Sequence, residues 1–235
     1  MQTPRERARE RTLNEIRKLA WHQVEEVGAA ALSLRGIARD LGIVSSAIYR
    51  YVASRDDLLT ALLVEGFSDL AEAVERAEAE VPRDAYRERW LTVCRAMRAW
   101  ALDRPAAWGL LYGGPVPGYA APQQTTGPPG ARVLLCQGAA LIEARAAGRL
   151  RPRQGPSGSL PEPPAELRAE LEGAAAAYQL DIDAEMVALG IFGWTISIAV
   201  ISSEIFEHLG PDAFHARDQL AEFQFAGTAD ALGLL

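Results

Sequence analysis

Few side chains in this sequence are of the types that carry out chemistry, and they are scattered. The histidines are His22, His208 and His215, and Glu204 stands four residues before His208. On a helix these two would share a face and supply half of a metal site, but such a pair is far more often a surface hydrogen bond. We therefore expect no metal, no cofactor and no catalytic centre.

The two cysteines and the absence of nucleotide or hydrolase motifs lead to the same expectation. Cys94 and Cys136 are far apart in apolar surroundings, which excludes a disulfide framework and favours reduced thiols in a cytoplasm. The sequence contains no Gly-x-Ser-x-Gly, no phosphate-binding loop and no dinucleotide fingerprint in a strand–helix context. An enzyme is not favoured.

The charge distribution is more informative than its total. The chain has 235 residues, 49% of them hydrophobic, and a formal net charge of −7, which at face value argues against nucleic acid as a partner. Residues 1–55, however, hold 10 Lys+Arg and 6 Asp+Glu, whereas residues 56–235 hold 14 and 25. A basic N-terminal part followed by an acidic remainder indicates which end would face a polyanion.

Signals for export or membrane insertion are weak. The N-terminus is charged and has no apolar core of the kind that signal peptides contain. The most apolar window, Met186 to Ile201, has 16 residues, contains Gly190 and Gly193, and is shorter than a membrane span usually needs. We expect a buried helix there, a cytoplasmic protein and no membrane partner.

Helical periodicity dominates, and no alternating β-branched stretch is long enough for a sheet. The sequence predicts an all-α fold in which three short helices precede a larger helical bundle. Glycine- and proline-rich loops are expected at 113–130 and 148–164. The helices are expected at about 13–27, 34–41, 45–51, 54–81, 84–103, 105–112, 131–147, 165–178, 184–208 and 212–232.

The segment from Ser33 to Asp57 has the features of a helix-turn-helix. Ala38 is small enough for two helices to cross closely, and Gly42, four residues later, suits the turn between them. Ile48 follows ten residues after Ala38 on the inner face of the second helix. The outer face of that helix carries short polar and basic groups that fit a major groove.

These residues resemble a known family. The runs Leu34-Arg-Gly-Ile-Ala-Arg-Asp-Leu-Gly42, Ala47-Ile-Tyr-Arg-Tyr-Val52 and Ser54-Arg-Asp-Asp-Leu-Leu59 resemble the DNA-binding domain of TetR-family transcriptional regulators over residues 12 to 63. The resemblance implies an N-terminal helix-turn-helix domain at 1–56, with 1–11 as a flexible arm, and a ligand-binding and dimerisation domain at 57–235. Trp194 and Glu204 resemble a C-terminal subclass named WHG, although Ala199 stands where that pattern has glycine.

The resemblance also implies roles at the DNA. Tyr49, Tyr51 and Arg55 match positions that contact the DNA backbone, and Arg35 falls where some members read a guanine. The implied DNA-binding residues are Ser33, Arg35, Ser45, Ser46, Tyr49, Arg50, Tyr51 and Arg55.

Two further assignments depend on helix capping. Ser33 could cap its helix or contact phosphate, and capping is the better supported reading. Val44 stands where the family often has a capping serine, so we expect Ser45 to take over the cap. The arginines at 5, 7, 9 and 11 alternate with glutamates at 6 and 10, and two readings stay open: a solvated terminus, or an arm that adds phosphate or minor-groove contacts.

The remaining expectations concern the C-terminal half. Reading a near-palindrome needs a dimer with recognition helices about 34 Å apart, and the last two long helices are its expected face, with an apolar stripe at Met186, Leu189, Phe192, Ile196 and Val200. The resemblance implies a pocket for a small hydrophobic or aromatic effector, and Trp108, Tyr112 and Tyr119 flank a flexible loop beside it. The candidate ligand-binding residues are Phe67, Met97, Trp100, Trp108, Tyr112, Tyr119 and Tyr178.

The function that these expectations favour is a ligand-responsive transcriptional regulator, in particular a repressor that binds a palindromic operator and is released by its effector. The alternative is a helical small-molecule-binding protein or enzyme whose apparent helix-turn-helix is only packing. Such a protein has no need for a polar outer face at Ser45, Ser46, Tyr49 and Arg50, whereas a protein that reads DNA does.

Overall fold

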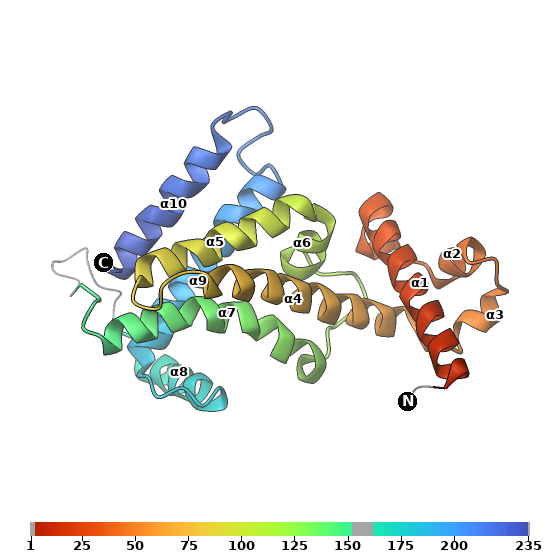
Figure 1. The fold of residues 1–235 in the computed structure, drawn as a ribbon, viewed down its shortest axis with the longest axis horizontal. Coiled ribbons are helices and arrows are strands. Elements are labelled where there is room, and N and C mark those ends of the chain that lie inside the picture. Colours follow the sequence, from red (N-terminus) through yellow and green to blue (C-terminus); the bar gives the residue numbers. More distant parts are fainter. Residues whose placement is uncertain (1–2, 152–161, 235) are drawn as a thin grey trace. The chain divides into compact units, whose positions relative to one another are not determined.

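The structure is a computed structural model that describes residues 3–151 and 162–234. Helices make up most of the described part, which contains no β-strand and a single antiparallel bridge between Leu150 and Leu234. The expected all-α fold is therefore confirmed (Figure 1). The elements are α1 (Pro4–Val27), the 3-10 turn η1 (Ala29–Ala31), α2 (Leu34–Asp40), α3 (Ser45–Ile48), α4 (Arg55–Ala79), α5 (Tyr86–Asp103), α6 (Pro105–Tyr112), α7 (Gln123–Ala146), α8 (Ala165–Ala177), α9 (Ala184–Ile205) and α10 (Arg217–Leu232).

The chain forms two compact units that do not follow the boundary expected between residues 56 and 57. The first unit comprises residues 1–69 and 104–130, and the second comprises residues 70–103 and 131–235. The first unit therefore takes in the beginning of α4, all of α6 and the beginning of α7. It is discontinuous in sequence because α6 packs on α1.

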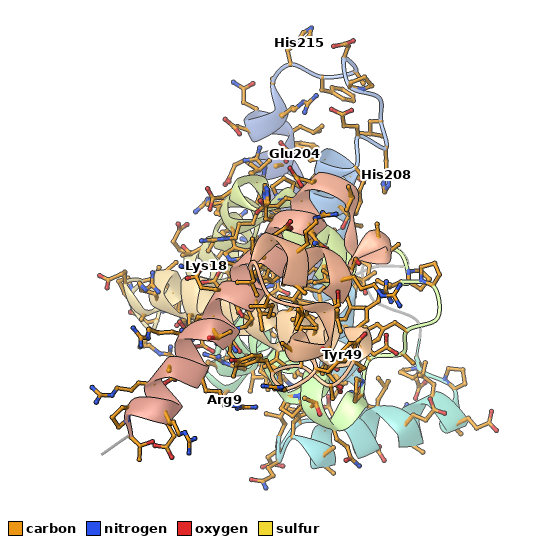
Figure 2. All side chains as sticks on the ribbon, turned by 90° about the vertical axis from the view of Figure 1, so that its right-hand side faces the viewer. Arg9, Lys18, Tyr49, Glu204, His208 and His215 are labelled. Atoms are coloured by element: carbon orange, nitrogen blue, oxygen red, sulfur yellow. The ribbon has the colours of Figure 1, made fainter. Side chains whose placement is uncertain are left out.

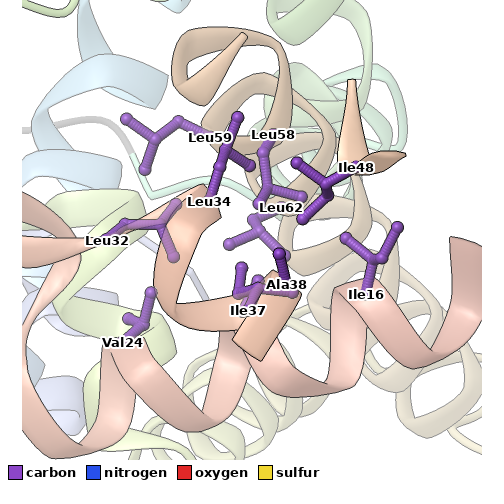
Figure 3. Close-up of a cluster of buried hydrophobic side chains, with 11 residues drawn as sticks. Ile16, Val24, Leu32, Leu34, Ile37, Ala38, Ile48, Leu58, Leu59 and Leu62 are labelled. Atoms are coloured by element: carbon purple, nitrogen blue, oxygen red, sulfur yellow. The ribbon is translucent and has the colours of Figure 1, made fainter. Parts of the chain in front are cut away.

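The core of the first unit consists of aliphatic side chains from the first four helices (Figure 3). Ile16 and Ala20 of α1, Ile37 of α2, Ile48 of α3 and Leu62 of α4 are all fully buried. In α1, α2 and α4 the buried positions recur at spacings of three or four residues, which gives each of these helices one apolar face, and α3 contributes Ile48. Burial of that face holds the short helices α2 and α3, which are too short to be stable alone.

The expected flexible arm is wrong for residues 4–11, which are the first two turns of α1. Thr3 caps the helix: its hydroxyl accepts a hydrogen bond from the backbone N–H of Glu6, and the Glu6 carboxylate accepts one from the backbone N–H of Thr3 at 2.7 Å. Pro4 at the first helical position has no N–H to leave unpaired. These local signals extend the helix beyond the apolar pattern from which its start was predicted.

The expected loop at 113–130 is also shorter than predicted, because α7 begins at Gln123 and contains Pro128 and Pro129. The prolines remove two backbone donors, which normally ends a helix. The N–H and the hydroxyl of Thr126, a buried residue, both donate to the carbonyl oxygen of Pro122, and the buried Ala131 anchors the next turn. The middle of the second expected loop, at 152–161, lies outside the described residues.

The second unit contains a buried ionic cluster. Arg89 of α5 is fully buried, and its guanidinium donates to Glu78 at the end of α4 and to Glu143 of α7, at 2.5 and 2.6 Å. Arg83 also pairs with both carboxylates. The hydrogen bond from Arg89 lowers the pKa of Glu143. Since a buried charge is costly unless it is paired, this cluster specifies how α4, α5 and α7 meet.

The second unit also contains the most apolar helix of the described chain. Helix α9 has 22 residues and a mean hydropathy of 1.9, so by length and composition it could cross a membrane. Helix α9 extends beyond the apolar window from Met186 to Ile201 at both ends. It packs on α5, α8 and α10, yet only 33% of its most apolar window is buried. Most of the remaining residues of α9 are half-buried, and Ile191 is its large apolar side chain with the greatest exposure, at 43%.

Candidate nucleic-acid interface

The turn between α2 and α3 has the geometry that its glycine predicted. Gly42 has a φ of 68°, in the left-handed region that glycine adopts at low cost. Its N–H donates to the carbonyl of Arg39, and the N–H of Ile43 donates to the carbonyl of Ala38 at 3.0 Å. This pair of bonds is a Schellman motif, which ends α2 and turns the chain toward α3.

A close approach between α1 and α2 fixes the first helix of the motif. Ser33 caps α2, since its hydroxyl accepts from the N–H of Gly36 at 3.3 Å, so the capping reading is confirmed. The side chain of Gln23 in α1 accepts from the N–H of Ser33 at 3.0 Å. A Cβ atom at Gly36 would lie 2.7 Å from the Gln23 amide nitrogen, so glycine is needed where the two helices meet.

Helix α3 presents the side chains that could read DNA. Ile48 is fully buried, whereas Ser45, Ser46, Tyr49 and Arg50 are exposed, and Tyr49 retains 52% of its surface. The regular α-helix ends at Ile48, earlier than predicted. The chain continues in a tighter turn, in which the N–H of Tyr51 donates to Ile48 at 2.9 Å. The polar outer face expected of a DNA reader is therefore present.

One capping expectation is wrong. Val44 has the extended backbone of an N-cap and leaves α3 without a side-chain cap, while Ser45 is the first residue inside the helix. The Ser45 side chain therefore lies exposed in the first turn. A recognition helix without its own cap relies on packing through Ile48 for its position.

Arg55 has a structural task that its sequence position did not reveal. Its guanidinium donates to the carbonyls of Ala29, Ala30 and Leu32 at 3.0, 2.9 and 3.1 Å. These carbonyls follow α1, so Arg55 links the beginning of α4 to the connection between α1 and α2. The preceding residue, Ser54, caps α4, since its hydroxyl accepts from the N–H of Asp57 at 3.0 Å. The contact of Arg55 with phosphate stays a prediction.

The other implied DNA contacts differ in exposure. Tyr51 is half-buried and packs against the core of the first unit. Arg35 in α2 is exposed. Arg9 in the second turn of α1, labelled in Figure 2, donates to the backbone carbonyl of Arg50 at 3.4 Å, which brings this arginine beside the turn that follows α3.

Four of the expected ligand-binding residues belong to the first unit, where they contact one another or its core. The Tyr112 ring lies 4.4 Å from that of Trp108 and edge-on to Phe67 at 5.8 Å, measured between centroids. Trp108 is fully buried, and burial raises the pKa of Tyr112. The hydroxyls of Tyr119 and Thr60 are 2.8 Å apart. These contacts give the four aromatic side chains a packing role, and ligand binding by them stays a prediction.

The other three expected ligand-binding residues belong to the second unit. Met97 and Trp100 are buried in α5. Tyr178, at the end of α8, is 45% exposed and lines an apolar cavity of about 260 Å³ between α7, α8 and α9. Neither Met97 nor Trp100 lines that cavity. The sequence analysis missed the other cavity residues, for which the available signal was the glycines inside α7 and α9.

The apolar stripe expected to form the dimer face is mainly core of one subunit. Met186, Leu189 and Val200 are buried within the second unit, and Phe192 and Ile196 are half-buried. Their helix packs on α5, α8 and α10, so the stripe is satisfied without a second copy. Helices α9 and α10 leave other apolar side chains exposed, among them Ile191 and Phe223.

The carboxylate of Glu204 is engaged by an arginine. Glu204 is 12% exposed and accepts two hydrogen bonds from Arg98, at 2.6 and 2.7 Å. His208 lies after the end of α9, on the connection to α10 (Figure 2). The glutamate therefore serves as the ion-pair partner of an arginine in α5.

The fold and the interface together define a class of protein. A capped helix-turn-helix with an exposed polar and basic outer face precedes a helical body, and this combination is that of a DNA-binding transcriptional regulator rather than an enzyme.

Comparisons with known proteins identify the family. Residues 16–62 match the family of bacterial regulatory proteins of the tetR type, and residues 90–227 match the tetracyclin repressor-like C-terminal domain. The chain is 40% identical to HTH-type transcriptional regulator Rv1816 of Mycobacterium tuberculosis and to Mb1846 of Mycobacterium bovis, over 87% of this chain and 85% of each relative. The protein belongs to the TetR family of transcriptional regulators.

Solved structures agree with this assignment. The crystal structure of regulatory protein SCO4313 is 29% identical, with a TM-score of 0.73 over 96% of this chain and 98% of that one. A bacterial regulatory protein of the tetR family from Rhodococcus RHA1 is 15% identical, with a TM-score of 0.63 over 95% and 97%, and shares the fold. The WHG-type C-terminal subclass stays a prediction.

Proposed function

We propose that this regulator is a repressor that binds a palindromic operator as a homodimer and is released by a small hydrophobic effector in the cytoplasm. The observation that carries the proposal is the outer face of α3, where Ser45, Ser46, Tyr49 and Arg50 are exposed around a fully buried Ile48. Such a face has no packing role in one subunit, and its donors and acceptors match those of base edges and phosphates.

The proposed contacts divide into two kinds. Ser45, Ser46 and Arg35 read base edges, since short hydroxyls and an arginine fork can pair with groups in the major groove. Tyr49 and Arg50 contact the DNA backbone, together with the hydroxyl of Tyr51. Arg55 also contacts a phosphate, while its guanidinium keeps its backbone carbonyl partners. The Ser33 hydroxyl already accepts from the N–H of Gly36, so any phosphate contact there is secondary to the cap.

The proposed dimer uses the faces of α9 and α10 that the subunit leaves uncovered. Phe223 in α10 is 76% exposed and Ile191 in α9 is 43% exposed. Gly227 and Ala231, one and two turns after Phe223, are exposed and small enough for a second helix to approach closely. Exposed apolar surface of this kind on two adjacent helices is characteristic of subunit interfaces.

The proposed release follows from thermodynamic linkage. An effector that prefers a dimer whose two recognition helices are wrongly spaced weakens DNA binding by the same factor by which DNA weakens effector binding. One helix-turn-helix reads only a few base pairs, so a change in spacing is enough to lose the operator.

The test is operator binding by full-length protein, measured by fluorescence anisotropy at several salt concentrations on a duplex selected from random sequences. Tyr49→Ala combined with Arg50→Ala is expected to weaken binding to every duplex and to flatten its salt dependence. Arg168→Ala is the matched control, since it removes one positive charge from an exposed site on α8. Unchanged binding by the Tyr49/Arg50 variant would refute the interface.

A further inference from the structure

We propose that the cavity between α7, α8 and α9 is the effector site of this regulator, and that it takes an uncharged apolar molecule of about ten carbon atoms. The inference rests on the proposed function in one respect, the coupling of this site to DNA release. The site itself rests on the geometry and lining of the cavity, whose volume is about 260 Å³.

The cavity exists because three helices meet through small residues. Gly138 and Ala139 of α7, Ala174 and Ala175 of α8, and Gly190 of α9 all line it. A Cβ atom at Gly138 or at Gly190 would have no neighbour within 4 Å. Both glycines are half-buried, so the small residues of the three helices leave a concave apolar surface with room for further atoms.

The frame around the cavity is fixed, which distinguishes it from a loosely packed edge. Helix α8 ends in a Schellman motif in which Gln179 has a φ of 56°, and the N–H of Leu180 donates to the carbonyl of Ala175 at 2.9 Å. This turn places Leu180 in the cavity wall. A left-handed conformation at a residue other than glycine is costly and is found where the surrounding structure requires it.

A second set of contacts fixes the beginning of α9 against α7. Asp183 caps α9 by accepting from the N–H of Met186 at 2.9 Å, and its carboxylate also binds the guanidinium of Arg145 in α7. The ion pair lowers the pKa of Asp183. Both charged groups are therefore committed to each other, and neither lines the cavity.

The lining determines the class of ligand. The cavity wall consists of aliphatic side chains and glycines with one aromatic residue, Tyr178, whose hydroxyl is its only side-chain hydrogen-bonding group. An ionised ligand would lose its hydration without gaining a counter-ion, which strongly disfavours it. A cavity of about 150 Å³ with an aliphatic and aromatic lining binds benzene, so one of 260 Å³ holds about ten carbon atoms.

The position of the cavity explains how binding could reach the DNA. Val187, Gly190 and Ile191 of α9 line it, and Ile191 also belongs to the face proposed for the dimer. A ligand that fills the space sets the position of α9 against α7 and α8. Because the spacing of two recognition helices depends on how the subunits pair, a shift of α9 changes operator affinity.

The first arm of the test measures binding directly in full-length protein. 1-Aminonaphthalene, an uncharged fluorescent probe with ten carbon atoms, is titrated into wild type, Gly138→Leu and Gly173→Leu. Leucine at Gly138 fills open space in the cavity and replaces a glycine inside a helix, so it is expected to weaken probe binding at least about tenfold while raising the melting temperature. Gly173 is an exposed helical glycine of α8 outside the cavity, so its variant is the matched control. Equal probe affinity in wild type and Gly138→Leu would overturn the site.

The second arm tests the ligand class and the coupling. 1-Decanol is expected to displace the probe and decanoate is not, and displacement by decanoate at equal or lower concentration would overturn the uncharged class. 1-Decanol is also expected to release wild type from its operator but not Gly138→Leu, and release of both would place the effector elsewhere. If the Gly138→Leu variant is a monomer in sedimentation, the cavity is part of a contact between subunits and the inference is overturned. A wild type that binds the probe but no DNA would refute the proposed function and leave the site standing.

Discussion

The guanidinium of Arg55 allows a sharp experimental test. The family resemblance implies that it contacts a DNA phosphate, whereas the structure shows that it stabilises the fold. It donates to three backbone carbonyls, those of Ala29, Ala30 and Leu32, at 2.9 to 3.1 Å. The side chain is 29% exposed and Leu32 is 3% exposed, so water cannot replace all of these bonds. Arg55→Ala therefore leaves at least one acceptor poorly satisfied.

The expected loss of stability follows from those contacts. A buried acceptor that loses its partner costs about 1–3 kcal/mol, and the two more accessible carbonyls of Ala29 and Ala30 recover most of theirs from water. We expect Arg55→Ala to lower the free energy of unfolding by about 2 kcal/mol. For a chain of this length that corresponds to a melting temperature lower by about 4–8 °C.

The assay is thermal unfolding followed by circular dichroism, with Arg50→Ala as the matched control. Arg50 is five residues away, carries the same charge and has an exposed side chain, so its variant is expected to stay within about 0.5 kcal/mol of wild type. Arg55→Lys keeps the charge but loses the planar fork, and is expected to be nearly as unstable as Arg55→Ala. If Arg55→Ala melts together with Arg50→Ala, the proposed structural role is refuted.

Three further predictions test other parts of the molecule. Phe223→Asp is expected to give a monomer in sedimentation and to lose operator binding with its helical content intact, and a dimeric variant would contradict the proposed interface. The pKa of Glu143 is lowered by its hydrogen bond from Arg89, so its charged form adds stability above its ordinary pKa of 4.5 that is lost as the pH falls. Glu143→Gln should therefore be less stable than wild type at pH 7 and less sensitive to acid below about pH 4, and parallel pH profiles of unfolding would contradict the assignment. Arg9→Ala is expected to reduce the salt slope of operator binding by about 0.9 if the first turns of α1 reach a phosphate, whereas an unchanged slope would leave Arg9 only its bond to Arg50.

The helix-turn-helix could be predicted from the sequence because its determinants are local. Gly42 and Ser33 act on backbone groups within five residues, and they turn or cap the chain as their types and positions predicted. The buried and exposed faces of α3 followed from the spacing of Ile48 and Tyr49. Family membership could be predicted for the same reason, since the motif is contiguous.

Contacts between distant segments could not be predicted. The three acceptors of Arg55 lie 23 to 26 residues before it, and no pattern in the sequence marks them. The same applies to the pairing of Arg89 with Glu143, which lies 54 residues away. The family resemblance that implied a phosphate contact for Arg55 contains no information on these carbonyl partners.

The sequence by itself thus determined the all-α fold class, the helix-turn-helix and the polar outer face of its second helix, because periodicity, caps and turn glycines act within a few residues. Only the tertiary structure decided which apolar side chains of α9 are core and which are surface, and where the helices leave a cavity. Residue type alone does not distinguish Leu189, which is buried, from Ile191, which is not. That distinction depends on which neighbouring helices cover each face, and helix packing is set by the whole fold.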